Sequence, residues 1–274
     1  MKITILGNGA FGSAMASYLS SIGHEIYIDA VKDSEIIFVC VPSFAVIKAL
    51  SEVEEGIRNQ KIVICSKGFA GEGKLLSQAL KEKFQNDFFF LYGPVLAEEL
   101  KNKKFSGMVL SGEVGKEKIK REIESESLHI ETSDDVIGSE VSAALKNAMT
   151  ILIGIVEGAG FGQNTSAYIF SKALEEIKKI GLALGGKTDT FLGLACVGDL
   201  TLLSRNRRLG IELGKGRKLE EIIKEMNHNP EGLSALKNAK IIVERLKIDA
   251  PLIKLLYSII FEDYPIKDIF KVIR

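Results

Sequence analysis

The sequence has few cysteines and no long apolar run, and both absences exclude classes of protein. Its three cysteines, Cys40, Cys65 and Cys196, are widely spaced and form no CxxC pair, which argues against a disulfide scaffold and a thiolate metal or redox motif. The best apolar run, residues 148–156, contains Thr150 and falls well short of the roughly eighteen residues that span a bilayer. We therefore expect buried thiols in a reducing compartment, no metal site and no membrane insertion.

A net charge and a targeting signal are missing as well. The 274 residues carry 36 Lys and Arg against 36 Asp and Glu, so the overall charge favours neither nucleic acid nor an anionic membrane as a partner. Residues 1–6 resemble a short strand before Gly7, too short for the apolar part of a secretion signal. With 46% hydrophobic residues, the chain can fold as one or two globular domains, and we expect it in the cytoplasm.

Up to about Asp134 the sequence alternates short β-branched runs with segments of helical periodicity. The predicted strands are 3–6, 25–28, 36–41, 62–65, 88–91 and 107–110, and helical segments between them include 14–21, 45–50 and 74–84. Continuous apolar strands separated by helices are typical of a parallel sheet covered on both faces. Residues 1–134 are therefore predicted to form a doubly wound, Rossmann-type domain of the α/β class.

After Asp134 the pattern becomes helical almost throughout. The predicted helices are 137–158, 165–184, 189–203, 219–226, 233–246 and 251–262, with glycine-rich joints at 158–162 and 185–186. Residues 135–274 are therefore predicted to form an all-helical domain. The densely charged run 116–126 has both signs and is interpreted as a solvated helix face.

A glycine-rich motif, GNGAFG at residues 7–12, follows the first strand and opens the first helix. In this position Gly7 makes a tight turn, Gly9 lets a pyrophosphate approach the backbone, and Gly12 lets helix and strand pack closely. The helix amino terminus adds unpaired N–H groups and a partial positive charge. We predict dinucleotide binding here; the alternative is a purely structural turn.

Polar and glycine residues follow the next strands, at the edge where a doubly wound sheet binds its ligands. The segments VPS at 41–43, SKG at 66–68 and YGP at 92–94 come directly after the third, fourth and fifth predicted strands. Lys67 is compatible with an ordinary exposed turn. It is equally compatible with an ammonium that meets a substrate or the nicotinamide ribose.

The helical half places two opposite charges in apolar surroundings. Lys146 lies within the apolar segment 141–156, and Asp199 lies within 191–203. An unpaired buried charge is costly, so Lys146 either extends to solvent or faces a cavity. Lys146 and Asp199 could offset each other's burial.

The segment SRNRR at 204–208 gathers three guanidinium groups and two neutral polar side chains. Arginine suits phosphate because its planar fork donates two parallel hydrogen bonds. The alternative is a solvated basic loop.

In this order, GNGAFG, VPS, SKG, GP, LKN at 145–147, GDL at 198–200 and SRNRRLG at 204–210 resemble NAD(P)-dependent glycerol-3-phosphate dehydrogenase. The segment 133–140 and the GQNT joint at 162–165 also look like that family. The resemblance covers nearly the whole chain. LKN followed by GDL and SRNRRLG is its most specific part.

The resemblance implies roles for individual residues. Lys146 matches the general acid/base that exchanges a proton with the C2 oxygen, and Asp199 matches the carboxylate that orients or tunes it. The positions that match substrate contacts are Lys67, Gly93, Ser204, Arg205 and Asn206, with Lys67 and Gly93 touching cofactor as well. The positions that match cofactor contacts are Gly7, Gly9, Ala10, Phe11, Gly12, Lys67, Ala97, Arg205 and Glu231.

Two departures from the family pattern concern substrate affinity and cofactor choice. Val95 follows the Gly-Pro pair where the family usually has Ser or Asn, which removes one polar substrate contact. The chain is also shorter than usual, mostly between Ile28 and Ile36, where the family has a helix and a strand on the adenine side. Asp29 ends the second strand at the place where a carboxylate accepts hydrogen bonds from the ribose 2′-OH, so we expect a slight preference for NAD over NADP. The competing readings are that Lys32 reaches a 2′-phosphate and that Asp29 merely caps a turn.

The predicted function is reversible hydride transfer between NAD(P)H and glycerone phosphate, giving sn-glycerol 3-phosphate for glycerophospholipid synthesis. Two alternatives stay open: a related hydroxy-acid dehydrogenase with another substrate, and a dinucleotide-binding sensor without turnover. The expected partner is a small phosphorylated substrate rather than nucleic acid. The sequence leaves the oligomeric state open, a homodimer included.

Overall fold

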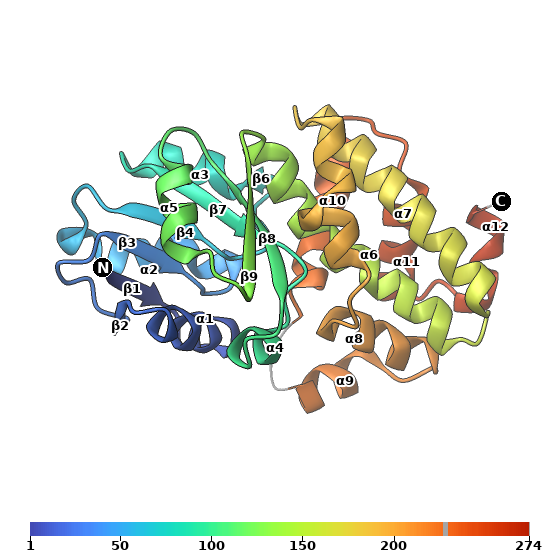
Figure 1. Ribbon diagram of the computed structural model, residues 1–274. Helices are drawn as coiled ribbons and strands as arrows, with labels where there is room; N and C mark the ends of the chain where they lie inside the picture. The colour runs from blue at the N-terminus through green and yellow to red at the C-terminus, as the bar shows by residue number, and fades with distance from the viewer. Residues whose placement is uncertain (227–229, 274) are drawn as a thin grey trace.

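The computed structural model describes residues 1–226 and 230–273, and one long helix joins its two parts (Figure 1). A sheet with its covering helices is built from the first half of the chain, and the described residues of the second half are helical or irregular. Helix α6 (Val136–Gly158) leads from the sheet into the helical part. The predicted fold class is confirmed.

The sheet of the first half has seven strands in the order β2-β1-β3-β4-β7-β8-β9. Its strands are β1 (Lys2–Leu6), β2 (Glu25–Ile28), β3 (Ile36–Val39), β4 (Lys61–Ile64), β7 (Phe88–Tyr92), β8 (Ser106–Ser111) and β9 (Leu128–Ser133). All neighbours pair in parallel except β7 and β8. The expectation of a parallel sheet is therefore wrong between β7 and β8. Strand β9 escapes the sequence prediction because buried and exposed side chains alternate at its start, so it has no continuous apolar run.

Helices cover both faces of the sheet. Against one face pack α1 (Ala10–Ser21), α4 (Ala97–Lys101) and α5 (Lys116–Ile123), which share a core with Ile3 and Ile5. The other face is covered by α2 (Val46–Glu52), α3 (Leu76–Lys83) and part of α6. Short elements complete this half: η1 (Ser43–Ala45), η2 (Glu54–Gly56), β5 (Phe69–Gly71) and β6 (Lys74–Leu75).

The connection between β2 and β3 replaces a helix and a strand with a loop. In a dinucleotide-binding sheet a third strand normally lies outside the second, but here β2 is the edge strand and residues 29–35 return directly to β3. The loop folds over β1, where the hydroxyl of the fully buried Thr4 donates to the Ala30 carbonyl at 3.0 Å and lies 2.7 Å from the Ser34 hydroxyl. Val31 packs against the adjoining core. The loop thus covers a face of β1 that a helix would otherwise cover.

The second half of the chain packs around α6. The other helices are α7 (Gln163–Ala183), α8 (Arg205–Gly214), α9 (Leu219–Met226), α10 (Glu231–Arg245), α11 (Pro251–Phe261) and α12 (Phe270–Ile273), with a short turn η5 (Ile266–Asp268). Helix α6 is long and apolar enough to cross a membrane by length and composition, with mean hydropathy 1.3 over its most apolar window. Since 89% of that window is buried inside the protein, α6 is the core of this half.

Two sequence expectations fail in this half. The predicted helix 189–203 is instead a 3-10 turn η3 (Thr188–Leu192) and a π-helical turn η4 (Leu194–Gly198), because Gly193 between them is extended. The alternative of a solvated loop for the arginine-rich segment fails as well: the segment opens α8, and the Ser204 hydroxyl accepts a hydrogen bond from the Arg207 N–H at the start of that helix.

Helices α6 and α8 are in backbone contact because both have glycines along the shared face. A Cβ atom on Gly154 would lie 2.2 Å from the Arg207 carbonyl oxygen, and one on Gly210 would lie 2.1 Å from the Ile151 carbonyl oxygen. Glycine is therefore required at both positions. This close approach fixes the start of α8, with its arginines, beside the middle of α6.

Candidate active site

Predicted site residues that follow β4 and β7 meet others from α6 and from the turn after η4. Lys67 follows β4, and its ammonium donates to the carbonyl of Gly93, which follows β7, at 3.0 Å. Lys146 comes from the middle of α6, and Asp199 directly follows η4. The topology thus brings together residues from both halves of the chain.

Asp199 bridges two lysine side chains at the centre of this region. One carboxylate oxygen lies 2.9 Å from the Lys146 Nζ, and the other lies 2.5 Å from the Lys67 Nζ. The side chains of Lys146 and Asp199 are 5% and 2% exposed, and that of Lys67 is 18% exposed. A buried charge requires a partner, and the predicted pairing of Lys146 with Asp199 is present. The participation of Lys67 in this ion pair is not foreseen by the sequence analysis.

The burial and the charges of this cluster tune its proton affinities. Burial lowers the pKa of Lys146 to about 8; the attraction of Asp199 opposes this shift, and the repulsion of Lys67 adds to it. Burial acts to raise the pKa of Asp199, but the two ammonium groups and their hydrogen bonds outweigh it, so the pKa lies below its usual value. Asp199 therefore stays ionised, while Lys146 can both give and take a proton near neutral pH.

Local structure holds these side chains in place. The Asp135 carboxylate caps α6 by accepting from the Gly138 N–H at 2.9 Å, and its second oxygen accepts from the Thr190 hydroxyl at 2.6 Å. The same carboxylate therefore ties the start of α6 to η3, the turn that leads to η4 and Asp199. π-Helical turns are rare and frequently occur at functional sites. Here the turn η4 places the carboxylate of Asp199 in a buried position.

A second polar cluster lies one residue further along α6. The Asn206 amide donates to the Asn147 side-chain oxygen at 3.0 Å and accepts from the Gly232 N–H at 3.1 Å. The Asn147 amide nitrogen is buried and has no hydrogen-bond partner among the described residues. An unpartnered buried donor beside Lys146 is suited to a ligand acceptor. Asn147 has no predicted role, although a neutral amide within an apolar helix is a signal that could have found it.

The arginines at the start of α8 have different environments. Arg207 makes a two-pronged ion pair with Glu157 of α6, at 2.5 and 3.0 Å, so it ties α8 to α6. Arg205 is exposed and lines a cavity of about 670 Å³ between α8 and α9. Arg208 and Arg217 line the same cavity, and Arg217 is paired with Glu212 at 3.2 Å. The lining has three arginines and two glutamates, Glu212 and Glu225, and both glutamates are paired with Arg217.

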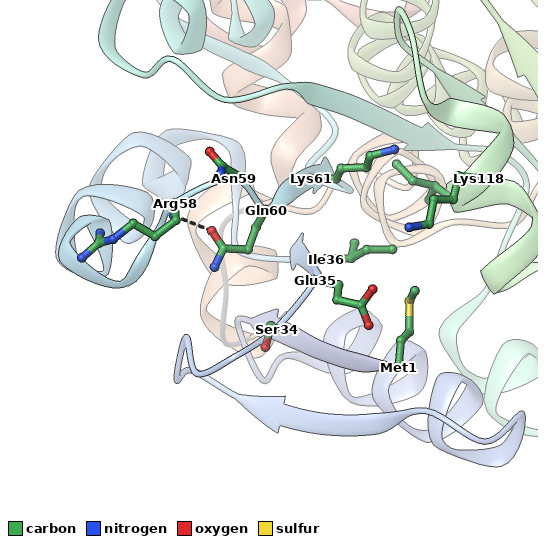
Figure 2. A pocket seen from close by; sticks show the side chains of 10 residues that line it. Met1, Ser34, Glu35, Ile36, Arg58, Asn59, Gln60, Lys61 and Lys118 are labelled. Atoms are coloured by element: carbon green, nitrogen blue, oxygen red, sulfur yellow. Dashed lines mark hydrogen bonds between the residues drawn. The ribbon is translucent and has the colours of Figure 1, made fainter.

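A further cavity lies at the opposite edge of the sheet. Its volume is about 380 Å³. Figure 2 shows it at the amino ends of β1, β3 and β4, with Met1, Glu35 and Lys118 among its lining side chains. None of the predicted site residues lines it. The carboxyl edge, where parallel sheets bind ligands, remains the candidate site.

The glycine-rich motif has the geometry that a dinucleotide requires. Gly7 has φ +101°, and a Cβ atom on Gly12 would lie 1.9 Å from the Gly7 carbonyl oxygen. At Gly9 the corresponding space is open, and Ala10 begins helix α1. Each glycine therefore fits the part assigned to it: a tight turn, room for a phosphate, and close packing of helix on strand.

Asp29 and Ala97, two other predicted cofactor residues, lie on elements next to this motif. Asp29 at the end of β2 has φ +51°, and its carboxylate accepts from the Gly7 N–H at 2.7 Å. Phe11 is partly buried on α1, and Ala97 begins α4, which packs against α1. The Lys32 ammonium lies over the ring of Tyr27 in β2, 4.9 Å from its centre.

Glu231, at the start of α10, interacts electrostatically with the lysines of this cluster. Burial raises its pKa, while the charges of Lys67, Lys146 and Arg205 and the backbone N–H of Ser43 work against that rise. Ser43 follows β3, so Glu231 connects the helical half to the sheet at the candidate site. Val95, which stands where the family usually has a polar substrate contact, packs partly against the sheet core.

Comparison with known proteins gives matches to one family over most of the chain. A family model for the amino-terminal part of NAD-dependent glycerol-3-phosphate dehydrogenase matches residues 27–117, and one for the carboxyl-terminal part matches residues 135–271. A glycerol-3-phosphate dehydrogenase (NAD(P)+) from Thermoanaerobacter sp. is 36% identical, with 96% of this chain and 93% of that protein aligned. The corresponding protein of Nitrosomonas europaea is 32% identical, with 97% and 95% aligned.

Solved structures show the same relationship. The crystal structure of glycerol-3-phosphate dehydrogenase from Coxiella burnetii superposes with a TM-score of 0.92 at 25% identity, covering 97% of this chain and 96% of that one. A ketopantoate reductase from Ralstonia eutropha, at 14% identity, covers 98% of this chain and 99% of its own with a TM-score of 0.66. The second likeness concerns the fold alone.

Proposed function

This chain belongs to the NAD-dependent glycerol-3-phosphate dehydrogenase family, and from that premise we propose how its residues reduce glycerone phosphate to sn-glycerol 3-phosphate. The enzyme is an oxidoreductase that uses NAD or NADP. The observation that carries the mechanism is the buried Lys146–Asp199–Lys67 cluster at the carboxyl edge of the sheet. The alternative of a hydroxy-acid reductase is supported by likeness of fold only, and the alternative of a sensor does not explain this tuned lysine.

The dinucleotide fits the glycine-rich motif and its surroundings. The open space at Gly9 and the amino terminus of α1 suit the pyrophosphate, and Asp29 suits the adenosine ribose. Gly7, Ala10, Phe11, Gly12, Ala97 and Glu231 are the further residues that we assign to the cofactor. When bound, the nicotinamide supplies the hydride that reduces the substrate carbonyl carbon, C2.

Lys146 is the proton donor in this proposal. Its ammonium protonates the oxygen that develops negative charge at C2, and in reverse its amine accepts that proton. Asp199 holds the ammonium in place and favours its charged form. Lys67, fixed by both Asp199 and the Gly93 carbonyl, adds a second positive charge next to the reacting oxygen. Neither Asp199 nor Lys67 needs to change its protonation state.

The substrate phosphate anchors the molecule at the start of α8. Arg205, Asn206 and Ser204 are the residues we assign to it, because they lie at a helix amino terminus and Arg205 adds a guanidinium group there. The unpartnered amide nitrogen of Asn147 supplies a further donor between phosphate and C2. Binding at this remote group fixes the carbonyl beside Lys146, so that binding energy is used for orientation.

Cofactor choice follows from the β2–β3 loop in this proposal. Asp29 is held at the end of β2 by the Gly7 N–H, where its other carboxylate oxygen can accept from a ribose 2′-OH and repel a 2′-phosphate. Lys32, the competing cation, is drawn back over Tyr27. We therefore propose a slight preference for NADH over NADPH.

The cellular setting is part of the same proposal. We divide the chain into a dinucleotide-binding domain, residues 1–134, and a helical substrate domain, residues 135–274, and place the enzyme in the cytoplasm. There its product would feed glycerophospholipid synthesis. A homodimer is the oligomeric state that we would test first.

Oxidation of NADH, followed at its absorbance band with glycerone phosphate as the oxidant, tests the function directly. Turnover with glycerone phosphate that exceeds turnover with unphosphorylated ketones supports the proposal. Turnover restricted to other ketones would favour a hydroxy-acid reductase, and NADH binding without any turnover would favour a sensor.

A further inference from the structure

Two cysteines lie side by side at the carboxyl edge of the sheet, and the proposed mechanism uses neither. Cys40 follows β3 and Cys65 follows β4, one step beyond the paired residues Val39 and Ile64. The N–H of Cys65 donates to the Val39 carbonyl at 2.9 Å, so the parallel ladder continues to this point. The two cysteines are therefore neighbours in register on adjacent strands.

Their side chains share one face of the sheet and contact each other. Both pack in the core beneath α1, where Cys65 is buried and Cys40 is partly exposed. Burial raises the pKa of the Cys65 thiol well above its usual value, and a hydrogen bond with the Cys40 thiol adds to that rise. The pair thus combines one partly exposed cysteine with one buried cysteine.

This pair also adjoins the two parts of the site that bind ligands. A Cβ atom on Gly12 would lie 3.2 Å from the Cys40 Cβ, so the glycine-rich motif rests directly on Cys40. Cys65 precedes Lys67 by two residues, and the intervening Ser66 donates to the Val41 carbonyl at 2.5 Å. A movement of either sulfur would therefore be transmitted to the dinucleotide loop and to Lys67.

We propose that Cys40 and Cys65 form a modification site, at which a peroxide produces a reversible disulfide that weakens dinucleotide binding. The Cys40 sulfur attacks one peroxide oxygen, the O–O bond breaks, and a sulfenic acid and one water (or alcohol) form. The Cys65 sulfur then attacks the sulfenic sulfur, the S–O bond breaks, and a second water leaves with the Cys65 proton. Both sulfurs are oxidised by one electron each, and the peroxide is reduced by two.

The spacing permits the bond at a small cost in geometry. Neighbouring strands lie about 4.8 Å apart, and disulfides join Cα atoms roughly 4.4–6.8 Å apart. The Cβ atoms must still approach more closely than a regular parallel ladder allows, which displaces the strand ends. That displacement disturbs Gly12 and Lys67, and this is why oxidation affects binding.

Peptide mapping after peroxide treatment tests the bond itself and does not depend on catalysis. The untagged protein is treated with hydrogen peroxide, alkylated without reduction and digested. We expect a linked peptide that contains Cys40 and Cys65, lighter than the reduced pair by two hydrogens, and protection of both thiols by bound NADH. Free alkylation of both thiols after oxidation, or a disulfide to Cys196 instead, would overturn the proposal.

Dinucleotide affinity before and after oxidation tests the consequence. We expect NADH affinity, measured by NADH fluorescence, to fall about 10- to 100-fold, because displacement of the strand ends misplaces the dinucleotide loop. The affinity should return with a thiol reductant. Cys40→Ala and Cys65→Ala should lose this response, and Cys196→Ala should retain it as the matched control. Equal sensitivity in all three variants would contradict the proposal. If instead the linked peptide forms and NADH binds but glycerone phosphate is not reduced, the proposed function fails and this site stands.

Discussion

The two ends of the proposed cofactor site are built in opposite ways. At the catalytic end, Lys146, Asp199 and Lys67 are buried and joined by ion pairs of 2.5 and 2.9 Å. At the adenosine end, an exposed carboxylate, Asp29, and the short loop 29–35 occupy the place of a helix and a strand. Chemistry requires fixed, desolvated charges, whereas recognition of the remote half of a cofactor can be reduced to a few contacts. The comparison predicts large effects of substitution at the first end and small ones at the second.

The largest effect is expected for Lys146→Ala. The variant should lose about 10²- to 10⁴-fold in kcat, the usual contribution of a positioned acid, while NADH affinity changes little. Alanine fits the apolar helix around it. Steady-state kinetics and NADH fluorescence measure the two quantities. A variant that kept more than a third of the wild-type kcat would show that Lys146 is not the proton donor.

Arg205→Ala should have the next largest effect, on substrate binding. We expect KM for glycerone phosphate to rise by the equivalent of about 1.5–3 kcal/mol, the value of a charge-assisted hydrogen bond, with little change for an unphosphorylated analogue. Arg207→Ala is the matched control, since Arg207 is paired with Glu157 and should affect thermal stability instead. Equal losses with both substrates would remove Arg205 from the phosphate site.

The loop that replaces the missing strand should matter for stability rather than for catalysis. Thr4→Val keeps the shape of the side chain but removes the hydrogen bonds to Ala30 and Ser34. We expect the free energy of unfolding to fall by about 1–3 kcal/mol, because buried polar partners are left unsatisfied. Urea unfolding measures it, and an unchanged midpoint would mean that the loop does not hold this face of β1.

The smallest effect is expected at Asp29. Asp29→Asn keeps an acceptor for the Gly7 N–H but loses the charge that repels a 2′-phosphate. The ratio of kcat/KM for NADPH to that for NADH should rise about two- to tenfold, the value of one modest hydrogen bond. Lys32→Ala should leave the ratio unchanged, because Lys32 lies over Tyr27. A wild-type preference for NADPH of more than about tenfold would contradict this assignment.

Strong, regular patterns explain how much of the fold could be predicted. The strands β1, β3 and β4 are continuous apolar runs and α6 is a long apolar helix, and their predicted bounds are close to the observed ones. The direction of β8 leaves no trace in its own residues, since a buried strand looks alike in either direction. The break at Gly193 depends on an extended conformation that one glycine permits but does not require.

For the site, the cost of burying a charge was the most informative principle. It pointed from the sequence to Lys146 and Asp199 as partners, and they form an ion pair. The second bond of Asp199, to Lys67, could not be predicted because it depends on how the turn after η4 meets the end of β4. The contact of Cys40 with Cys65 likewise follows from strand order, which their separation in sequence does not reveal.

The pH dependence of kcat/KM in both directions tests the central claim, that Lys146 exchanges the proton, most directly. With a lysine pKa of about 8, reduction of glycerone phosphate should be constant below that pH and fall as the ammonium deprotonates above it. Oxidation of glycerol 3-phosphate should rise towards pH 8 and then level off. Asp199→Asn should move both midpoints to lower pH, because the attraction that favours the ammonium is lost. Profiles without an inflection between pH 7 and 9, roughly one unit on either side of that pKa, or midpoints unmoved in Asp199→Asn, would contradict the account.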